Sequence, residues 1–155
     1  MVILASSCPQ QPNMSELYRE LETDRNQGLK MLSALERAGL VALVSSGKNM
    51  LKSMSRPEKI YCDNTNLMYA LNTASPDIGT MRETFFVNQL RASHHNVVCA
   101  EHGDFVVDGK QLFEIGGRRK SFEQIKDIPN SYVAADDIEC GTGNKIPLWL
   151  FGMLY

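Results

Sequence analysis

Residues 103–117, which read GDFVVDGKQLFEIGG, contain the pattern that decides the fold of the second half of the chain. Apolar residues flank Asp108-Gly109, a dipeptide typical of tight hairpin turns. The pattern predicts one strand over 104–107 and a second over 111–115. We therefore expect an antiparallel pair of strands here.

Further helices and strands are predicted on both sides of this hairpin. Their order is helix, three strands, helix, strand, helix, which predicts an α/β (α+β) domain with a mixed sheet flanked by helices. The apolar tail over 146–155 is ten residues long, so we expect a helix docked on the core rather than a membrane anchor. The other predicted elements are helices over 64–71, 79–92 and 121–128 and strands over 97–100 and 132–134.

The first sixty residues have a different pattern. Apolar residues at helical spacing predict a helix from Met14 to Leu21, with Asn13 as its N-cap. A second helix, capped by Thr23 or Asp24, is expected to end at Gly39. Strands over 40–44 and 59–62 follow, with a turn after the first. This order is typical of a winged helix-turn-helix, so we expect that domain over 1–62 and the α/β domain over 63–155.

Nucleic-acid binding by the first domain is one of two interpretations. In a DNA-reading winged helix the second helix enters the major groove and the hairpin contacts phosphates. Residues 1–60 carry eight Lys or Arg and six Asp or Glu, a net +2, and residues 61–155 carry eight and twelve, a net −4. So small an excess also suits a protein–protein connector. The candidate nucleic-acid-binding residues are Arg25, Asn26, Gln27, Lys30, Lys48 and Lys52.

Three carboxylates of the second domain are candidates for chemistry. Glu83 lies on the predicted helix over 79–92, and Asp104 and Glu114 lie on the two hairpin strands. An aspartate and a glutamate on adjacent strands, aimed to the same side, can bind one Mg²⁺ through oxygen ligands. The metal would activate water and neutralise phosphodiester charge, as in the PD-(D/E)xK nucleases. The competing interpretation is that both are ordinary hairpin carboxylates.

Other features point to no further cofactor. The four cysteines are far apart and form no CxxC pair, so we expect reduced thiols rather than a zinc site. We expect solvated side chains for His94, His95 and His102 and a solvated acidic turn over 136–139. No stretch reaches the roughly 18 apolar residues of a membrane span. We expect a cytoplasmic protein without membrane contacts.

Several short sequence stretches together resemble those of a known protein family. They are CPQQPN (8–13), KIYCDNTNL (59–67), RETFF (82–86), GDF (103–105), FEIGG (113–117) and IPLWLFG (146–152). Together they resemble the C-terminal region of a family of prokaryotic AAA-type ATPases. The resemblance implies a P-loop ATPase domain upstream in the parent protein, then a winged helix, then a PD-(D/E)xK nuclease-like domain of unassigned function.

The chain departs from this family pattern at two places. It has no GxxxxGK[ST] loop, since Gly47-Lys48 is followed by Asn49, so we expect no ATP binding by this chain alone. The nucleases spell their third strand Glu-x-Lys, whereas here Glu114 is followed by Ile115 and Gly116. Losing one preorganised charge costs on the order of 10²–10³ in rate. Either Arg118 or Lys120 reaches back to replace the lysine, or the site is inactive.

The leading interpretation is a non-catalytic binding or regulatory module of an AAA-type ATPase that contacts nucleic acid or a protein partner and needs no cofactor. The first alternative is an active Mg²⁺-dependent nuclease that uses Glu83, Asp104 and Glu114 with a relocated basic residue. The second alternative is a structural dimerisation domain. It is motivated by the apolar tail over 146–155 and the aromatic pair Phe85-Phe86.

Overall fold

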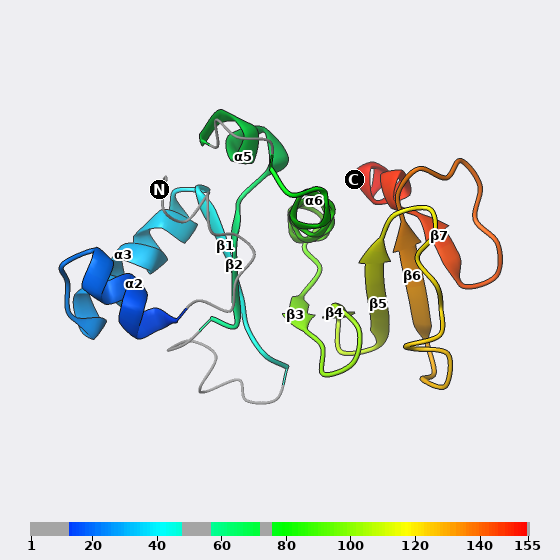
Figure 1. The fold of residues 1–155 in the computed structure, drawn as a ribbon, viewed down its shortest axis with the longest axis horizontal. Helices are drawn as coiled ribbons and strands as arrows, with labels where there is room; N and C mark the ends of the chain where they lie inside the picture. Colours follow the sequence, from blue (N-terminus) through cyan, green and yellow to red (C-terminus); the bar gives the residue numbers. More distant parts are fainter. Residues whose placement is uncertain (1–12, 48–56, 72–75, 155) are drawn as a thin grey trace. The chain divides into compact units, whose positions relative to one another are not determined.

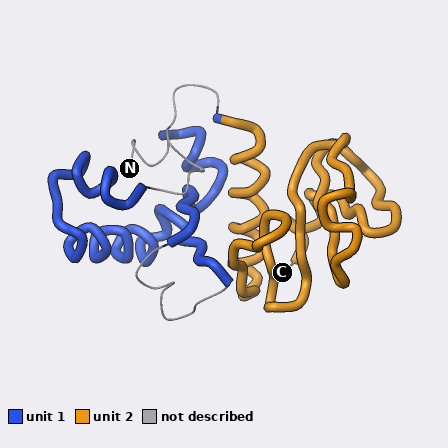
Figure 2. Tube along the Cα trace, turned by 60° about the horizontal axis from the view of Figure 1, so that its bottom comes forward, with its two compact units in different colours: residues 1–76 blue, residues 77–155 orange. Residues whose placement is uncertain are grey.

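The computed structural model describes residues 13–47, 57–71 and 76–154, and it has mixed α/β architecture with helices and two separate sheets. The chain divides into two compact units, residues 1–76 and 77–155 (Figures 1 and 2). The helix α5 (Thr65–Leu71) therefore belongs with the first unit, although the sequence suggested a second domain starting at residue 63.

The first unit begins with two short amphipathic helices whose starts follow from local capping. The Asn13 side chain accepts a hydrogen bond from Glu16 N at the start of α2 (Met14–Glu20). Asp24 Oδ1 accepts from the backbone N–H groups of residues 26 and 27 at the start of α3 (Arg25–Arg37). Asp24, rather than Thr23, is thus the N-cap of the second helix.

Close packing of these two helices depends on Gly28. A Cβ at this position would lie 2.4 Å from both Cδ1 and Cε1 of the Tyr18 ring. Tyr18 is buried in a core with residues of α2, α3 and the following strands, and this burial raises the pKa of its hydroxyl. The absence of a side chain at position 28 therefore lets the ring rest directly on α3.

An antiparallel strand pair follows α3. Gly39, directly after the C-cap Ala38, has φ +66°, and the backbone bonds Gly39 N→Glu36 O and Leu40 N→Leu35 O end the helix at this glycine, as expected. β1 (Val41–Val44) then pairs with β2 (Lys59–Cys62) in the register Val41↔Cys62. The predicted strands are confirmed, and of the turn predicted over 45–49 the last two residues, 48 and 49, lie outside the described residues.

In its described residues the second unit has one α-helix, one 3₁₀ helix and a five-stranded sheet of order β3-β4-β5-β6-β7. β3, β4 and β5 are antiparallel neighbours, and β5, β6 and β7 are parallel. The predicted hairpin is confirmed, with Asp108 and Gly109 both at positive φ in its turn. The elements are α6 (Ile78–Ala92), β3 (Val97–Cys99), β4 (Phe105–Val107), β5 (Gln111–Gly116), β6 (Ser131–Ala135), β7 (Lys145–Pro147) and the 3₁₀ helix η1 (Leu148–Met153).

Aromatic side chains join α6 and η1 to one face of this sheet. The Phe86 ring lies 5.7 Å from that of Phe105, 5.1 Å from that of Phe113 and 4.8 Å from that of Phe151. Phe86 is therefore fully buried, and only Phe85 of the aromatic pair is partly accessible. The pair does not form the exposed surface that motivated the dimerisation alternative.

The opposite face is covered by the connection between β5 and β6, where the predicted helix over 121–128 is absent. Ile125 N donates to Phe122 O and Ile128 N donates to Ile125 O, both at 3.1 Å, so the segment forms successive turns. The Ser131 hydroxyl donates to the carbonyls of both isoleucines. Turns of period three place these apolar side chains on the sheet as a helix would, which explains the incorrect prediction.

The apolar tail also differs from the single helix predicted. It begins as the edge strand β7 and continues as η1, whose Leu148 and Phe151 are buried. Docking on the core is thus confirmed, but as a strand and a 3₁₀ helix. Four large apolar residues of this end of the chain are exposed: Trp149, Leu150, Met153 and Leu154.

Candidate functional site

Glu114 lies at the centre of the candidate site, on the middle strand of the sheet. Side chains alternate along β5, so Glu114 points away from the face on which Phe113 meets the aromatic rings of α6 and η1. Glu114 is only 3% exposed, and its Oε1 forms an ion pair with the Lys120 ammonium. Its Oε2 is buried without a hydrogen-bond partner among the described residues. Few buried polar atoms in folded proteins lack a hydrogen-bond partner.

Lys120 reaches Glu114 because position 116 has no side chain. The Lys120 N–H donates to Gly117 O at 2.9 Å, which closes a turn after β5 and directs the lysine back toward the strand. A Cβ on Gly116 would lie 2.7 Å from Cβ and Cγ of Lys120 and 2.8 Å from Cδ. The stem of Lys120 thus occupies the space beside the backbone at 116, where the nuclease pattern places its lysine.

Asp104 lies directly before β4, beside the same strand. Its Oδ2 accepts a hydrogen bond of 2.6 Å from Ile115 N. Its own N–H donates to Phe113 O at 2.9 Å, so Asp104 contacts β5 on both sides of Glu114. Gly103, at φ +77°, also approaches this glutamate, since a Cβ there would lie 3.2 Å from Glu114 Oε2. The backbone before β4 therefore passes close to the unsatisfied oxygen, and a side chain at position 103 would meet it.

Glu83 does not complete a group of three acids with Asp104 and Glu114. Over residues 13–47, 57–71 and 76–154, no three His, Cys, Asp or Glu side chains come together in a way that could hold a metal ion. The physical reason is that α6, which carries Glu83, covers the Phe113 face, whereas Glu114 points to the other face.

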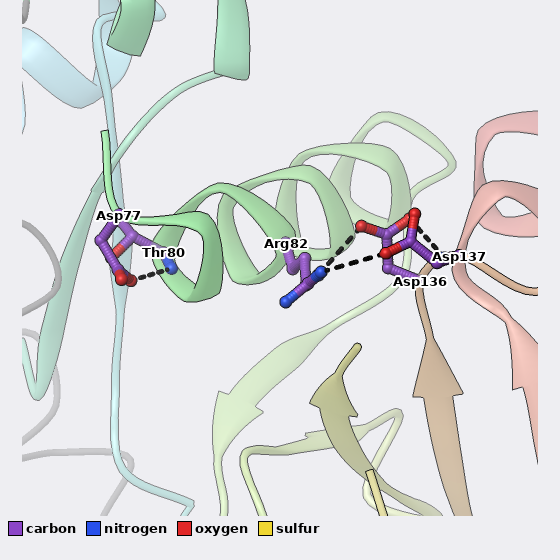
Figure 3. A network of polar contacts seen from close by, with 5 residues as sticks. All are labelled: Asp77, Thr80, Arg82, Asp136 and Asp137. Atoms are coloured by element: carbon purple, nitrogen blue, oxygen red, sulfur yellow. Dashed lines mark hydrogen bonds and ion pairs between the residues drawn. The ribbon is translucent and has the colours of Figure 1, made fainter. Parts of the chain in front are cut away.

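Arg82 and Asp136 form a neighbouring contact that the sequence pattern did not reveal. Arg82 Nε donates to Asp136 Oδ2 at 2.9 Å, and Nη2 lies 3.8 Å from Asp137 Oδ2 (Figure 3). A Cβ on Gly117 would lie 3.2–3.3 Å from the Arg82 guanidinium. The segment over 136–139 was expected to be solvated, but its first residue is tied to α6. The signal available in the sequence was the glycine pair at the end of a strand, which indicates close approach of other groups.

Arg118 and Arg119 differ from Lys120 in having exposed side chains. Neither forms an ion pair with a described residue. Of the two basic residues considered as substitutes for the missing lysine, the structure therefore brings Lys120, and not Arg118, onto Glu114.

The candidate nucleic-acid-binding residues of the first unit lie together at the start of α3. Arg25, Asn26, Gln27 and Lys30 are exposed and line an open hollow of about 640 Å³. Asp24 lines the same hollow, so one carboxylate offsets part of the positive charge there. The other two candidates, Lys48 and Lys52, lie outside the described residues.

The histidines and cysteines form no competing site in the described part of the chain. His95 Nδ1 lies 2.7 Å from Asp108 Oδ2, and a backbone bond from Asn96 together with this histidine lowers the pKa of Asp108. Three cysteines lie in the described segments and form no disulfide there, Cys62 and Cys99 being buried and Cys140 exposed. Burial raises the pKa of the Cys62 thiol.

No helix in the described segments combines the length and apolar character needed to cross a membrane. Comparisons of the chain with protein-family models, with curated proteins and with solved structures find no match, so the functional argument rests on the residues themselves.

Proposed function

We propose that the second unit is a nuclease-like module that hydrolyses phosphodiester bonds with the help of one divalent cation. The observation that carries the proposal is the Lys120–Glu114 ion pair built over Gly116. It puts an ammonium beside the strand position where the PD-(D/E)xK pattern requires a lysine. The element order α6-β3-β4-β5-β6, with β5 and β6 parallel, supports the same interpretation.

The residues present fit a cation at this place. Glu114 Oε2 is a buried oxygen without a donor among the described residues, and the carboxylate of Asp104, directly before β4, lies on the backbone of the next residue, Ile115. Mg²⁺ commonly uses one or two carboxylates and keeps several water ligands, so a third acid is not required. When bound, Mg²⁺ would neutralise phosphate charge and acidify a coordinated water.

The chain's own residues then have separate roles. Asp104 and Glu114 would hold the cation, and the Lys120 ammonium would stabilise the negative charge that develops on the phosphate as water attacks phosphorus and one phosphorus–oxygen bond breaks. The Lys120 side chain is 33% exposed, so its charge lies at the border between the buried glutamate and solvent. The exposed side chains of Arg118 and Arg119 would contact neighbouring phosphates of the same nucleic-acid strand.

The test is cleavage by the purified full chain. We expect nicking of plasmid DNA, or cleavage of single-stranded DNA or RNA, with Mg²⁺ or Mn²⁺ and none with EDTA. Asp104→Ala and Glu114→Gln should abolish it. Lys120→Met should lower the rate on the order of 10²–10³-fold. Lys110→Met, which removes an exposed lysine from the β4–β5 turn, is the matched control and should leave the rate unchanged.

A non-catalytic module of an AAA-type ATPase is the second candidate. It is favoured by the Ile115 N–H, which already occupies one oxygen of Asp104, and by the failure of Glu83 to join the other two acids. This candidate predicts no cleavage by any variant but a salt-dependent shift of labelled DNA or RNA. If the first unit makes that contact, Arg25→Ala and Lys30→Ala should weaken it.

Homodimerisation remains a separate prediction. The exposed apolar residues of η1 and its C-terminal neighbour support it, whereas burial of Phe86 removes part of its original motivation. Light scattering of the full chain at tens of micromolar tests it, since a monomer at that concentration contradicts a dimerisation function.

A further inference from the structure

Lys145 is held by the sheet in a position from which it reaches the turn that carries Lys120. Its backbone pairs with Val133 at the start of β7. Two more bonds, Thr142 N→Lys145 O at 3.0 Å and Lys145 N→Thr142 O at 3.1 Å, fix it from the other side. The side chain therefore starts from a backbone that is held by both neighbours.

The ammonium of Lys145 binds two carbonyls of the turn over 117–120. Lys145 Nζ donates to Arg118 O at 2.7 Å and to Lys120 O at 3.1 Å. Lys145 forms no ion pair with a described residue, so its ammonium interacts with these two carbonyl oxygens instead. Hydrogen bonds from charged donors are stronger than those from neutral donors. The turn is thus tied to β7 across 25 and 27 residues of sequence.

Lys120 is consequently constrained along its whole length. Its N–H is bound by Gly117 O, its carbonyl by Lys145 and its ammonium by Glu114, while its stem lies against Gly116. A lysine side chain loses conformational entropy when it is fixed, so it stays in one conformation only where such contacts hold it. Without the bond to its carbonyl, the turn loses a restraint that keeps the stem on the strand.

We propose that Lys145 is a positioning residue that holds the turn over 117–120 so that Lys120 lies on Glu114. The inference deepens the proposed function and rests on it for its catalytic consequence, but the placement itself is independent of catalysis. Preorganised charges lose their effect when their position is no longer fixed.

The placement is tested by the reactivity of the Lys120 amine. Trace acetylation of the full chain, followed by peptide mass spectrometry, compares Lys120 with the exposed Lys110 as internal reference. We expect slow labelling of Lys120 in the native chain, severalfold faster labelling in Lys145→Met, and native behaviour in Lys145→Arg, whose guanidinium can also donate to two carbonyls. Lys126→Met is the matched control, because Lys126 pairs only with Glu123 among the described residues.

Activity provides the second readout. Lys145→Met should lower kcat on the order of 10–100-fold with little change in KM, and Lys145→Arg should restore most of kcat. Unchanged Lys120 labelling in a Lys145→Met chain with native circular dichroism overturns the inference. If Lys145→Met does not fold, failure of the folded Lys145→Arg to protect Lys120 overturns it as well. If the native chain cleaves no nucleic acid but Lys120 is labelled faster in Lys145→Met, the proposed function is refuted. The positioning role of Lys145 is then still supported.

Discussion

Replacing Gly116 by alanine tests whether the stem of Lys120 occupies the space of a side chain at that position. The new Cβ would lie 2.7 Å from Cβ and Cγ of Lys120 and 2.8 Å from Cδ. Carbon atoms in favourable contact are about 3.5–4.0 Å apart, so the methyl group overlaps three atoms by about 0.7–1.3 Å. The nearest of these atoms lies next to the backbone, where lysine cannot simply swing aside.

The expected loss of stability follows from three contributions. Overpacking of this kind costs about 1–3 kcal/mol. Displacing Lys120 also removes the counter-charge of the buried Glu114, at less than the about 3–5 kcal/mol of a fully buried pair because a third of the Lys120 side chain is exposed. Alanine restricts the unfolded chain and returns about 0.4–1 kcal/mol. The gain from alanine offsets part of the cost of the lost counter-charge, so we expect Gly116→Ala to lower the free energy of unfolding by at least the overpacking cost, about 1–3 kcal/mol.

Urea unfolding of the full chain, followed by tryptophan fluorescence, is the assay. Trp149 is the one tryptophan of the sequence and lies in η1, so it reports on the second unit. Backgrounds with Lys120→Ala, which keeps one overlapping atom, and Lys120→Gly, which removes all three, make the test quantitative. The loss of unfolding free energy caused by Gly116→Ala should be smaller in the Lys120→Ala background. In the Lys120→Gly background Gly116→Ala should slightly stabilise the chain. A Gly116→Ala chain as stable as the native one, or an equal penalty in all three backgrounds, refutes the reasoning.

Two further predictions concern the helices. Gly28→Ala should destabilise the first unit by about 1–2 kcal/mol because its methyl group meets the Tyr18 ring at 2.4 Å, and it should stabilise a Tyr18→Ala chain by up to about 1 kcal/mol. Hydrogen exchange of α2 and α3 measures the stability change caused by Gly28→Ala in the native and the Tyr18→Ala chains. A change of the same sign in the two chains contradicts the proposed contact with the Tyr18 ring. Asp77→Ala removes the cap of α6, in which Asp77 Oδ2 accepts from the Thr80 backbone and hydroxyl, and should cost about 1 kcal/mol at pH 6. These bonds, the backbone one first, lower the pKa of Asp77, so the advantage is complete above its unfolded pKa of about 3.9 and is lost as pH falls through the lower folded value. Urea unfolding at pH 6 and towards pH 3 checks this, and a difference that grows on acidification contradicts it.

Local chemistry made most elements of the fold predictable. Asp24 caps α3, Gly39 ends that helix at positive φ, and Asp108-Gly109 forms the tight turn between β4 and β5. Each of these outcomes depends on residues a few positions apart, so the sequence contains the complete signal. The segment over 121–128 shows the limit, because Ser131 and the sheet face select turns of period three over a helix with nearly the same apolar spacing.

The sequence alone also determined which residues are candidates for the site, namely Asp104 and Glu114 on adjacent strands and a basic residue after Gly116. Only the tertiary structure decided which of them meet. Lys120, and not Arg118, pairs with Glu114, because the turn after β5 directs Lys120 back toward the strand. Lys145, at the start of β7, donates hydrogen bonds to two carbonyls of that turn. Arg82 donates a hydrogen bond to Asp136, which is 54 residues away in the sequence. Glu83 lies on the helix that covers one face of the sheet, whereas Glu114 points to the other face. Such contacts depend on which face of a strand or helix each side chain occupies after packing, and neither spacing nor composition specifies that.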